Sequence, residues 1–310
     1  MTRWNDANQN TIIKVNKGNE TYYNNVITMN YRKKCITTSH TVNNNQGEVN
    51  NNNNYVNHHN KNHHVKEVGY KKVVTYCEDS DNIMVEKYYN DDKREGVWKE
   101  WYEDEQNMLW SEEHYVNGKK HGLCREWSGV VQDRLLSEGH YVNGEKHGLH
   151  TEWYDNDQHL VSDERHYDNG KQIGTWRGWH SNPQHTISYE TPYVNGKAYG
   201  LYKEWHNNDK HTLSCEGQEV DNKRHGLWHA WYNNDEHTLW YEGHYVDGKM
   251  HGVWKEWYNN KKHTLKYKGH YVNGKRNKHW EEFDIHGKVT FDGYYINDVK
   301  SNKIRNKHTK

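Results

Sequence analysis

A glycine returns every 26 residues through most of this 310-residue chain, and a tryptophan follows five residues after each of these glycines. The glycines are Gly96, Gly122, Gly148, Gly174, Gly200, Gly226 and Gly252. The tryptophans are Trp101, Trp127, Trp153, Trp179, Trp205, Trp231 and Trp257. A fixed period of this length is typical of small structural units that pack only against their neighbours. The repeat therefore predicts an elongated surface and argues against a compact enzyme built around one pocket.

Each unit is expected to contain two antiparallel strands. In the unit that begins at Gly252, aromatic and charged residues alternate over 253–258, a polar loop covers 259–263, and a second strand covers 264–272. Second strands end in Asn-Gly or Asp-Gly, the strongest short-range signal for a two-residue hairpin turn. Such a turn joins only antiparallel neighbours. The predicted fold class is all-β: an elongated, single-sheet antiparallel meander of β-hairpin repeats, with about nine units.

The chain divides into three segments by composition. Residues 1–66 are Asn-rich and of low complexity, and we expect them to be mostly disordered because they bury too little apolar surface. Within this arm, β-branched residues over 26–41 indicate a strand or two. Residues 67–298 form the hairpin array, and residues 299–310 form a basic tail.

Composition restricts where the protein works and what it binds. With 15 Trp and 25 Tyr but only two Phe, the core is expected to be thin and aromatic. A formal net charge of −1 provides no overall field to recruit nucleic acid. Cys35, Cys77, Cys124 and Cys215 lie far apart, and the N-terminus lacks an apolar signal core. We therefore expect a cytoplasmic protein with free thiols in a reducing compartment and no transmembrane segment.

Two rows of aromatic residues compete for the core and for a contact surface. The row at Trp101 is kept in every full unit, and we expect it to form the core. A second row begins at Trp98, two residues after the repeat glycine, and is replaced by Cys124 and His150 in two units. Strand alternation places it on the opposite face. This variability favours a contact surface made of Trp98, Trp176, Tyr202, Trp228 and Trp254.

Smaller residues add two further expectations about packing. Glycines at 139, 217, 243 and 269 precede the second-strand tyrosine by two residues, and we expect each to leave room for a ring from a neighbouring strand. The strand register, and hence which ring fills which space, is left open. Adjacent residues such as Lys99 and Glu100 are expected to point to opposite faces as solvated cross-strand partners.

The sequence shows no constellation that would carry catalysis. Histidines recur before the second-strand tyrosine, before the repeat glycine and at the loop end, as at His114, His121 and His159. Imidazoles bind zinc and nickel, but no unit adds the thiol or carboxylate spacing of a dedicated site. A nucleophile elbow, a phosphate loop and a zinc-protease motif are all lacking. We therefore predict a non-enzymatic protein with no catalytic, cofactor-binding or metal-binding residues and no cofactor.

The segment EGHYVDGKMHGVWKEWY, residues 242–258, resembles the MORN repeat in its bacterial-type variant form. The resemblance covers about residues 69–298 and recurs at least seven times. It implies an elongated antiparallel β array that serves as a scaffold for protein contacts and sometimes for lipid surfaces. Some variant-form members are described as antitoxins. This chain departs from the family in a longer loop, such as 233–237, and in having no companion catalytic domain such as a lipid kinase.

These observations leave three functions open. The leading hypothesis is a scaffold that mediates protein–protein interaction along one face of a long sheet. One alternative, suggested by the resemblance, is a peripheral membrane or phosphoinositide-binding module that contacts an anionic lipid surface. The other is an antitoxin-like neutraliser of a partner protein. The partner, the binding face, the oligomeric state, the role of the Asn-rich arm and metal binding by the histidine rows are not determined by the sequence.

Overall fold

The structure, a computed structural model, describes residues 70–77, 80–103 and 106–301 together with five short strands nearer the N-terminus. All of its regular elements are β-strands. The rest of the Asn-rich arm, predicted to be disordered, lies outside the described residues, as does the basic tail beyond residue 301. The predicted all-β class is confirmed.

Most strands belong to one antiparallel sheet in which chain neighbours pair with each other. Two small pairs precede it: β1 (Trp4–Asn5) with β2 (Thr11–Ile12), and β3 (Val15–Lys17) with β4 (Glu20–Tyr22). The sheet strands are β5 (Cys35–Val42), β6 (Tyr70–Cys77), β7 (Ile83–Asn90), β8 (Lys93–Arg94), β9 (Gly96–Trp101), β10 (Leu109–Val116), β11 (Lys119–Lys120), β12 (Gly122–Trp127), β13 (Leu135–Val142), β14 (Glu145–Trp153), β15 (Val161–Asp168), β16 (Lys171–Trp179), β17 (Ile187–Val194), β18 (Lys197–Ala198), β19 (Gly200–Trp205), β20 (Leu213–Val220), β21 (Lys223–Trp231), β22 (Leu239–Val246), β23 (Lys249–Trp257), β24 (Leu265–Val272), β25 (Lys275–Phe283), β26 (Val289–Ile296) and β27 (Val299–Ser301).

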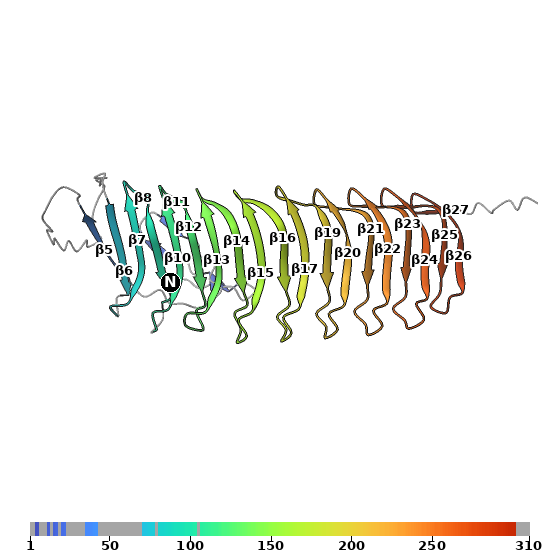
Figure 1. Ribbon diagram of the computed structural model, residues 1–310, viewed down its shortest axis with the longest axis horizontal. Coiled ribbons are helices and arrows are strands. Elements are labelled where there is room, and N and C mark those ends of the chain that lie inside the picture. The colour runs from blue at the N-terminus through green and yellow to red at the C-terminus, as the bar shows by residue number, and fades with distance from the viewer. Residues whose placement is uncertain are drawn as a thin grey trace, which may run out of the picture.

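The sheet is an open, elongated ribbon, as the repeat predicted. Figure 1 shows β5 and β27 at opposite ends of a single row of strands. Among the described strands, β5 pairs only with β6 and β27 only with β26. β5 falls within the stretch 26–41 and its flank, where β-branched residues predicted a strand. The sheet therefore takes in one strand from the Asn-rich arm and the first residues of the basic tail.

The hairpin turns have the predicted geometry. At a representative turn, Asn117 has φ of 51° and Gly118 has φ of 83°, the two positive values that a type I′ turn requires. The repeat glycine has a different role, because it lies beyond the turn at a register shift. Gly226 has φ of 69°, and the ladder slips between Gly217 and Gln218 opposite it. A bulge of this kind bends the strand.

Strand register separates the sheet into two chemically different faces. Trp254 lies between Gly243 and Gly269 on the neighbouring strands, whereas the next residue, Lys255, lies between Glu242 and Lys268 on the other side. We call these the aromatic face and the charged face. The alternation continues along the array, so Lys99 and Glu100 point to opposite faces as predicted: Lys99 pairs with Glu112, and Glu100 with Lys87.

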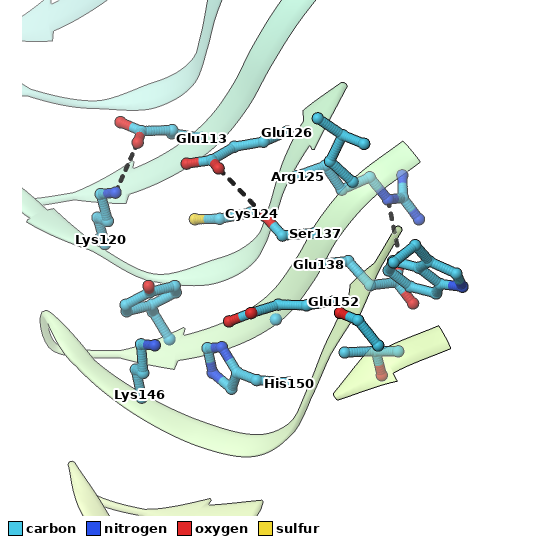
Figure 2. Close-up of a pocket in the computed structure, with 16 residues that line it drawn as sticks. Glu113, Lys120, Cys124, Arg125, Glu126, Ser137, Glu138, Lys146, His150 and Glu152 are labelled. Atoms are coloured by element: carbon cyan, nitrogen blue, oxygen red, sulfur yellow. Dashed lines mark hydrogen bonds and ion pairs between the residues drawn. The ribbon is translucent and has the colours of Figure 1, made fainter. Parts of the chain in front are cut away.

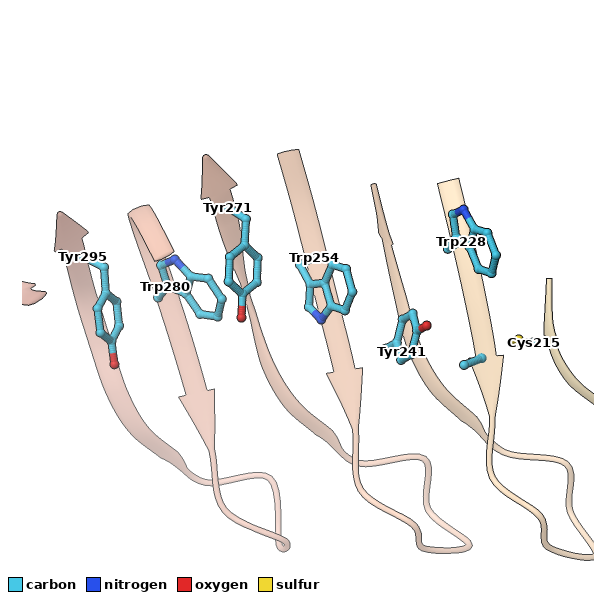
Figure 3. Packing of buried hydrophobic residues seen from close by; sticks show 8 residues of the cluster. Cys215, Trp228, Tyr241, Trp254, Tyr271, Trp280 and Tyr295 are labelled. Carbon is cyan, nitrogen blue, oxygen red and sulfur yellow. The ribbon is translucent and has the colours of Figure 1, made fainter. Parts of the chain in front are cut away.

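The core lies on the aromatic face and is made of rings from successive strands. Figure 3 shows Trp228, Tyr241, Trp254, Tyr271 and Trp280 side by side across neighbouring strands. Each indole covers a glycine of the preceding strand. A Cβ added at these glycines would meet a ring carbon at 2.2 Å for Gly217 under Trp228, 1.9 Å for Gly243 under Trp254 and 2.1 Å for Gly269 under Trp280. The prediction that these glycines make room for rings is confirmed.

Candidate functional site

The structure buries the row that the sequence assigned to a contact surface. Trp98 is 5% exposed, Trp228 is 0% and Trp254 is 5%, while Trp176 and Tyr202 are half-buried. The assignment of Trp98, Trp228 and Trp254 to an exposed contact surface was therefore wrong. The physical reason is the register, because glycines on the preceding strands give several of these rings a flat surface to pack on.

The Trp101 row is only partly buried, and it anchors the loops. Trp179 stacks on His185 at a centroid distance of 5.5 Å and an interplanar angle of 20°. His185 Nε2 lies 2.7 Å from the carbonyl oxygen of Val161, one unit earlier. Equivalent stacks join Trp205 to His211 and Trp231 to His237. The loop-end histidines thus hold adjacent hairpins together.

The charged face carries a ladder of ion pairs between neighbouring strands. The nitrogen–oxygen distances run from 2.6 to 3.2 Å in Lys72–Glu86, Lys99–Glu112, Arg125–Glu138, Arg177–Glu190, Lys255–Glu242 and Lys268–Glu281. Because opposite charges alternate, the ladder neutralises itself over most of its length. It therefore provides little net attraction for a polyanion such as nucleic acid.

Beside this ladder runs an exposed apolar row, which the sequence reasoning missed. Its best exposed members are Leu149, Leu201, Leu227 and Val253, each 42–46% exposed. We call this the leucine row. Its signal is present in the sequence, since Leu or Val directly follows the repeat glycine in six of the seven units, with Thr175 in the other. Alternation from the buried tryptophan one residue later would have placed the row on the opposite face.

The aromatic face is interrupted at one place, where the tryptophan position holds Cys124 and then His150. A hollow of about 350 Å³ opens there. Figure 2 shows Cys124 and His150 on successive hairpins, with Glu126 next to Cys124 and joined to Ser137 by a hydrogen bond. Gly139 forms the floor under the His150 ring, whose Nδ1 would lie 2.0 Å from a Cβ added there.

Charges around the hollow are mostly paired. Lys120 Nζ lies 2.5 Å from Glu113, and Arg165 from the next strand binds Glu152 at 2.7 Å. Burial disfavours the charged forms of both Glu113 and Lys120. The hydrogen bond from Lys120 nevertheless keeps the pKa of Glu113 below its ordinary value. Glu126 differs from these carboxylates, because the described residues give it a hydrogen bond from Ser137 and no basic partner.

The thiol and the imidazole of the hollow are held neutral. Burial raises the pKa of the Cys124 thiol above 9.0 and lowers the pKa of His150 below 6.5. A neutral thiol is a poor nucleophile and a poor metal ligand. Within the part of the chain that the structure describes, no group of three or more His, Cys, Asp or Glu side chains is arranged to hold a metal ion.

Two further observations complete the description. In the described ranges, no helix is long and apolar enough to span a membrane. Comparison with models of known protein families finds no match, and no curated protein matches the chain significantly. The resemblance to MORN repeats therefore rests on the repeated sequence motif, and the function has to be argued from the surfaces of the sheet.

Proposed function

We propose that this chain is a non-enzymatic repeat scaffold of the MORN type that binds a protein partner along the charged face of its sheet. The observation that carries the proposal is the leucine row. Four of its six apolar members are more than 40% exposed, beside a core in which Trp98, Trp228 and Trp254 are 0–5% exposed. Rows of exposed apolar side chains rimmed by polar residues are typical of protein-binding surfaces.

The spacing of the row also favours an extended partner. Each unit adds two strands, so members of the row recur about every 9.6 Å along the sheet. A partner that presents apolar side chains at a similar interval would bury several members at once. The self-neutralised ladder beside the row favours such an apolar contact over binding to anionic lipid, which depends on an excess of basic residues.

Retention of a partner by the intact chain tests the proposal. The immobilised protein is compared with the variant Leu201→Glu/Leu227→Glu, which places charges in the centre of the row. Val130→Glu is the matched control, because Val130 is 80% exposed in a loop outside the row. We expect wild type and control to retain a protein in stoichiometric amount and the double variant to lose it. Equal retention by all three, or no stoichiometric partner, would contradict the proposal.

A one-to-one complex with a partner whose toxicity is suppressed would make the scaffold an antitoxin. Binding to anionic vesicles that the Glu variants leave unchanged would instead favour the membrane hypothesis. The same set of variants therefore separates the three functions that the sequence leaves open.

A further inference from the structure

The hollow on the aromatic face lies where Cys124, Ser137 and His150 stand in place of larger rings that occupy these positions in other units. In a complete part of the array, Tyr241 and Trp254 from adjacent strands stack with centroids 4.9 Å apart and an interplanar angle of 17°. Ser137 stands four units before Tyr241, and His150 stands four units before Trp254. The hollow thus replaces a stacked pair by a small hydroxyl residue and a smaller ring.

The polar partner of the missing tyrosine is still in place. Tyr267, five units after Ser137, donates its phenol hydrogen to Glu256 on the adjacent strand. Glu126 is the equivalent of Glu256, and among the described residues it accepts a hydrogen bond from Ser137 Oγ alone, at 3.3 Å. A serine hydroxyl reaches the acceptor that a phenol reaches elsewhere, but it leaves the volume of the ring empty.

Within the part of the chain that the structure describes, Glu126 has no basic partner, unlike Glu256. Glu256 is paired with Lys266 at 2.7 Å, whereas the residue five units before Lys266 is Leu136, which lines the hollow. The carboxylate therefore keeps accepting capacity beside an apolar side chain. The hollow thus offers an aromatic ring the neighbouring rings of Tyr141 and His150, and offers its hydroxyl the Glu126 carboxylate, within a lining that is otherwise mostly polar.

We propose that the hollow bounded by Cys124, Ser137 and His150 binds a tyrosine side chain of another polypeptide. The ring lies in the space that Tyr241 or Tyr267 fills in other units, and its hydroxyl donates to Glu126. Tyr141 presents a neighbouring ring, 5.3 Å from His150 in an edge-to-face arrangement. The volume of about 350 Å³ is at the small end of ligand pockets, which suits a single side chain.

The site is on the opposite face from the leucine row, so it is a second contact and goes beyond the proposed scaffold function. This proposal rests on the proposed function in one respect, because a polypeptide partner supplies the tyrosine. The test uses small probes and requires no natural partner. Failure of the leucine-row experiment and failure of this proposal are therefore distinguishable.

The probe is N-acetyl-L-tyrosinamide, titrated into the full chain and followed by NMR signals of the His150 ring. We expect saturable binding with a dissociation constant on the order of 1 mM. N-acetyl-L-phenylalaninamide should bind at least threefold more weakly because it has no donor for Glu126. Butylammonium, which mimics a lysine side chain, tests whether Glu126 prefers a cation. Equal binding of the two amides, tighter binding of butylammonium than of the tyrosine amide, or no saturation would overturn the proposal. If 4-methylphenol binds as tightly as the tyrosine amide, the assignment to a polypeptide tyrosine fails.

Two variants and a control link the binding to the hollow. Ser137→Tyr supplies the missing ring from the chain itself. It should weaken the binding of the tyrosine amide at least tenfold without lowering the urea midpoint of unfolding. Glu126→Gln should remove the preference for tyrosine over phenylalanine. Glu242→Gln is the matched control, because Glu242, four units after Glu138, pairs with Lys255 on the charged face away from the hollow. Unchanged binding by Ser137→Tyr, or loss of the preference in the control, would contradict the site.

Discussion

Replacing Trp228 by alanine should cause one of the largest losses of stability available from a single substitution in this array. The indole is 0% exposed, covers Gly217, and donates its Nε1 hydrogen to the Gln218 carbonyl at 3.0 Å. The Arg224 guanidinium lies 4.1 Å from its centroid. Truncation of a buried tryptophan to alanine costs about 3–5 kcal/mol. Loss of the hydrogen bond, about 1 kcal/mol, favours the upper half of that range.

Trp240 provides the matched control, since it is also a tryptophan and lies on the adjacent strand β22. It is 43% exposed and contacts Tyr232 in a tilted arrangement and Tyr241 edge-to-face, at centroid distances of 5.8 and 5.3 Å. Its replacement by alanine should cost about 1 kcal/mol, the value of aromatic pairing plus partial burial. Urea unfolding followed by far-ultraviolet circular dichroism gives both losses by linear extrapolation. Losses within about 1 kcal/mol of each other would refute the assignment of the Trp98 row to the core.

Four further predictions follow from individual contacts. Gly226→Ala should destabilise by about 1–2 kcal/mol because φ is 69°, and Gly226→Asn should lose less in the same urea assay, since asparagine tolerates this conformation; equal losses would contradict the backbone explanation. His237→Ala should cost about 1–2 kcal/mol by removing the stack on Trp231 and the 2.9 Å contact with the Leu213 carbonyl, and a neutral urea midpoint would argue against a structural role. Burial lowers the pKa of His150, so the unfolded chain takes up this proton at higher pH than the folded protein does. Stability should therefore fall as pH drops below about 6.5, and His150→Leu should show a shallower fall in urea midpoints measured from pH 7 to pH 5. Burial with the neighbouring Glu204 raises the pKa of Cys215 to about 12, so peptide mapping after iodoacetamide treatment should find Cys215 modified only in urea; rapid native modification would contradict its burial.

The sequence predicts the array because the signals that specify it are local. Asn117-Gly118 requires positive φ at both positions, and a two-residue turn leaves only an antiparallel neighbour. Glycines such as Gly243 predict a close approach by a ring without any knowledge of which strand supplies it. Both inferences need information from fewer than ten consecutive residues, and both are confirmed.

The division of the two faces was harder to predict because it depends on register. Regular recurrence predicts the Trp101 row as core, yet Trp179 is only half-buried and stacks on His185 at the end of a loop. The more variable row is buried, because Gly217 and Gly243 lie beside Trp228. The bulge at Gly226 sets the pairing of Trp228 with Gly217. Without the register, regular recurrence cannot distinguish a loop anchor from a core residue.

The hollow was partly visible in the sequence. Cys124 and His150 stand out as replacements in a tryptophan row, but variation was interpreted as a feature of a surface. In the structure, the same two residues lie on the buried face and leave a space. The missing information was that Ser137, on the intervening strand, is small beside Glu126 and Glu152, two residues from Gly139, which pairs with Cys124 and His150.

The central claim is that hairpins add side by side in an open sheet, and distances along the leucine row test it most directly. Nitroxide pairs are placed at 201 and 253, 149 and 253, and 97 and 253 in a chain whose native cysteines are replaced by alanine. With two strands per unit, the account predicts separations of about 19, 38 and 58 Å by pulsed electron–electron double resonance, rising linearly with the number of units. Separations that level off or shorten between the second and third pair would contradict an open ribbon.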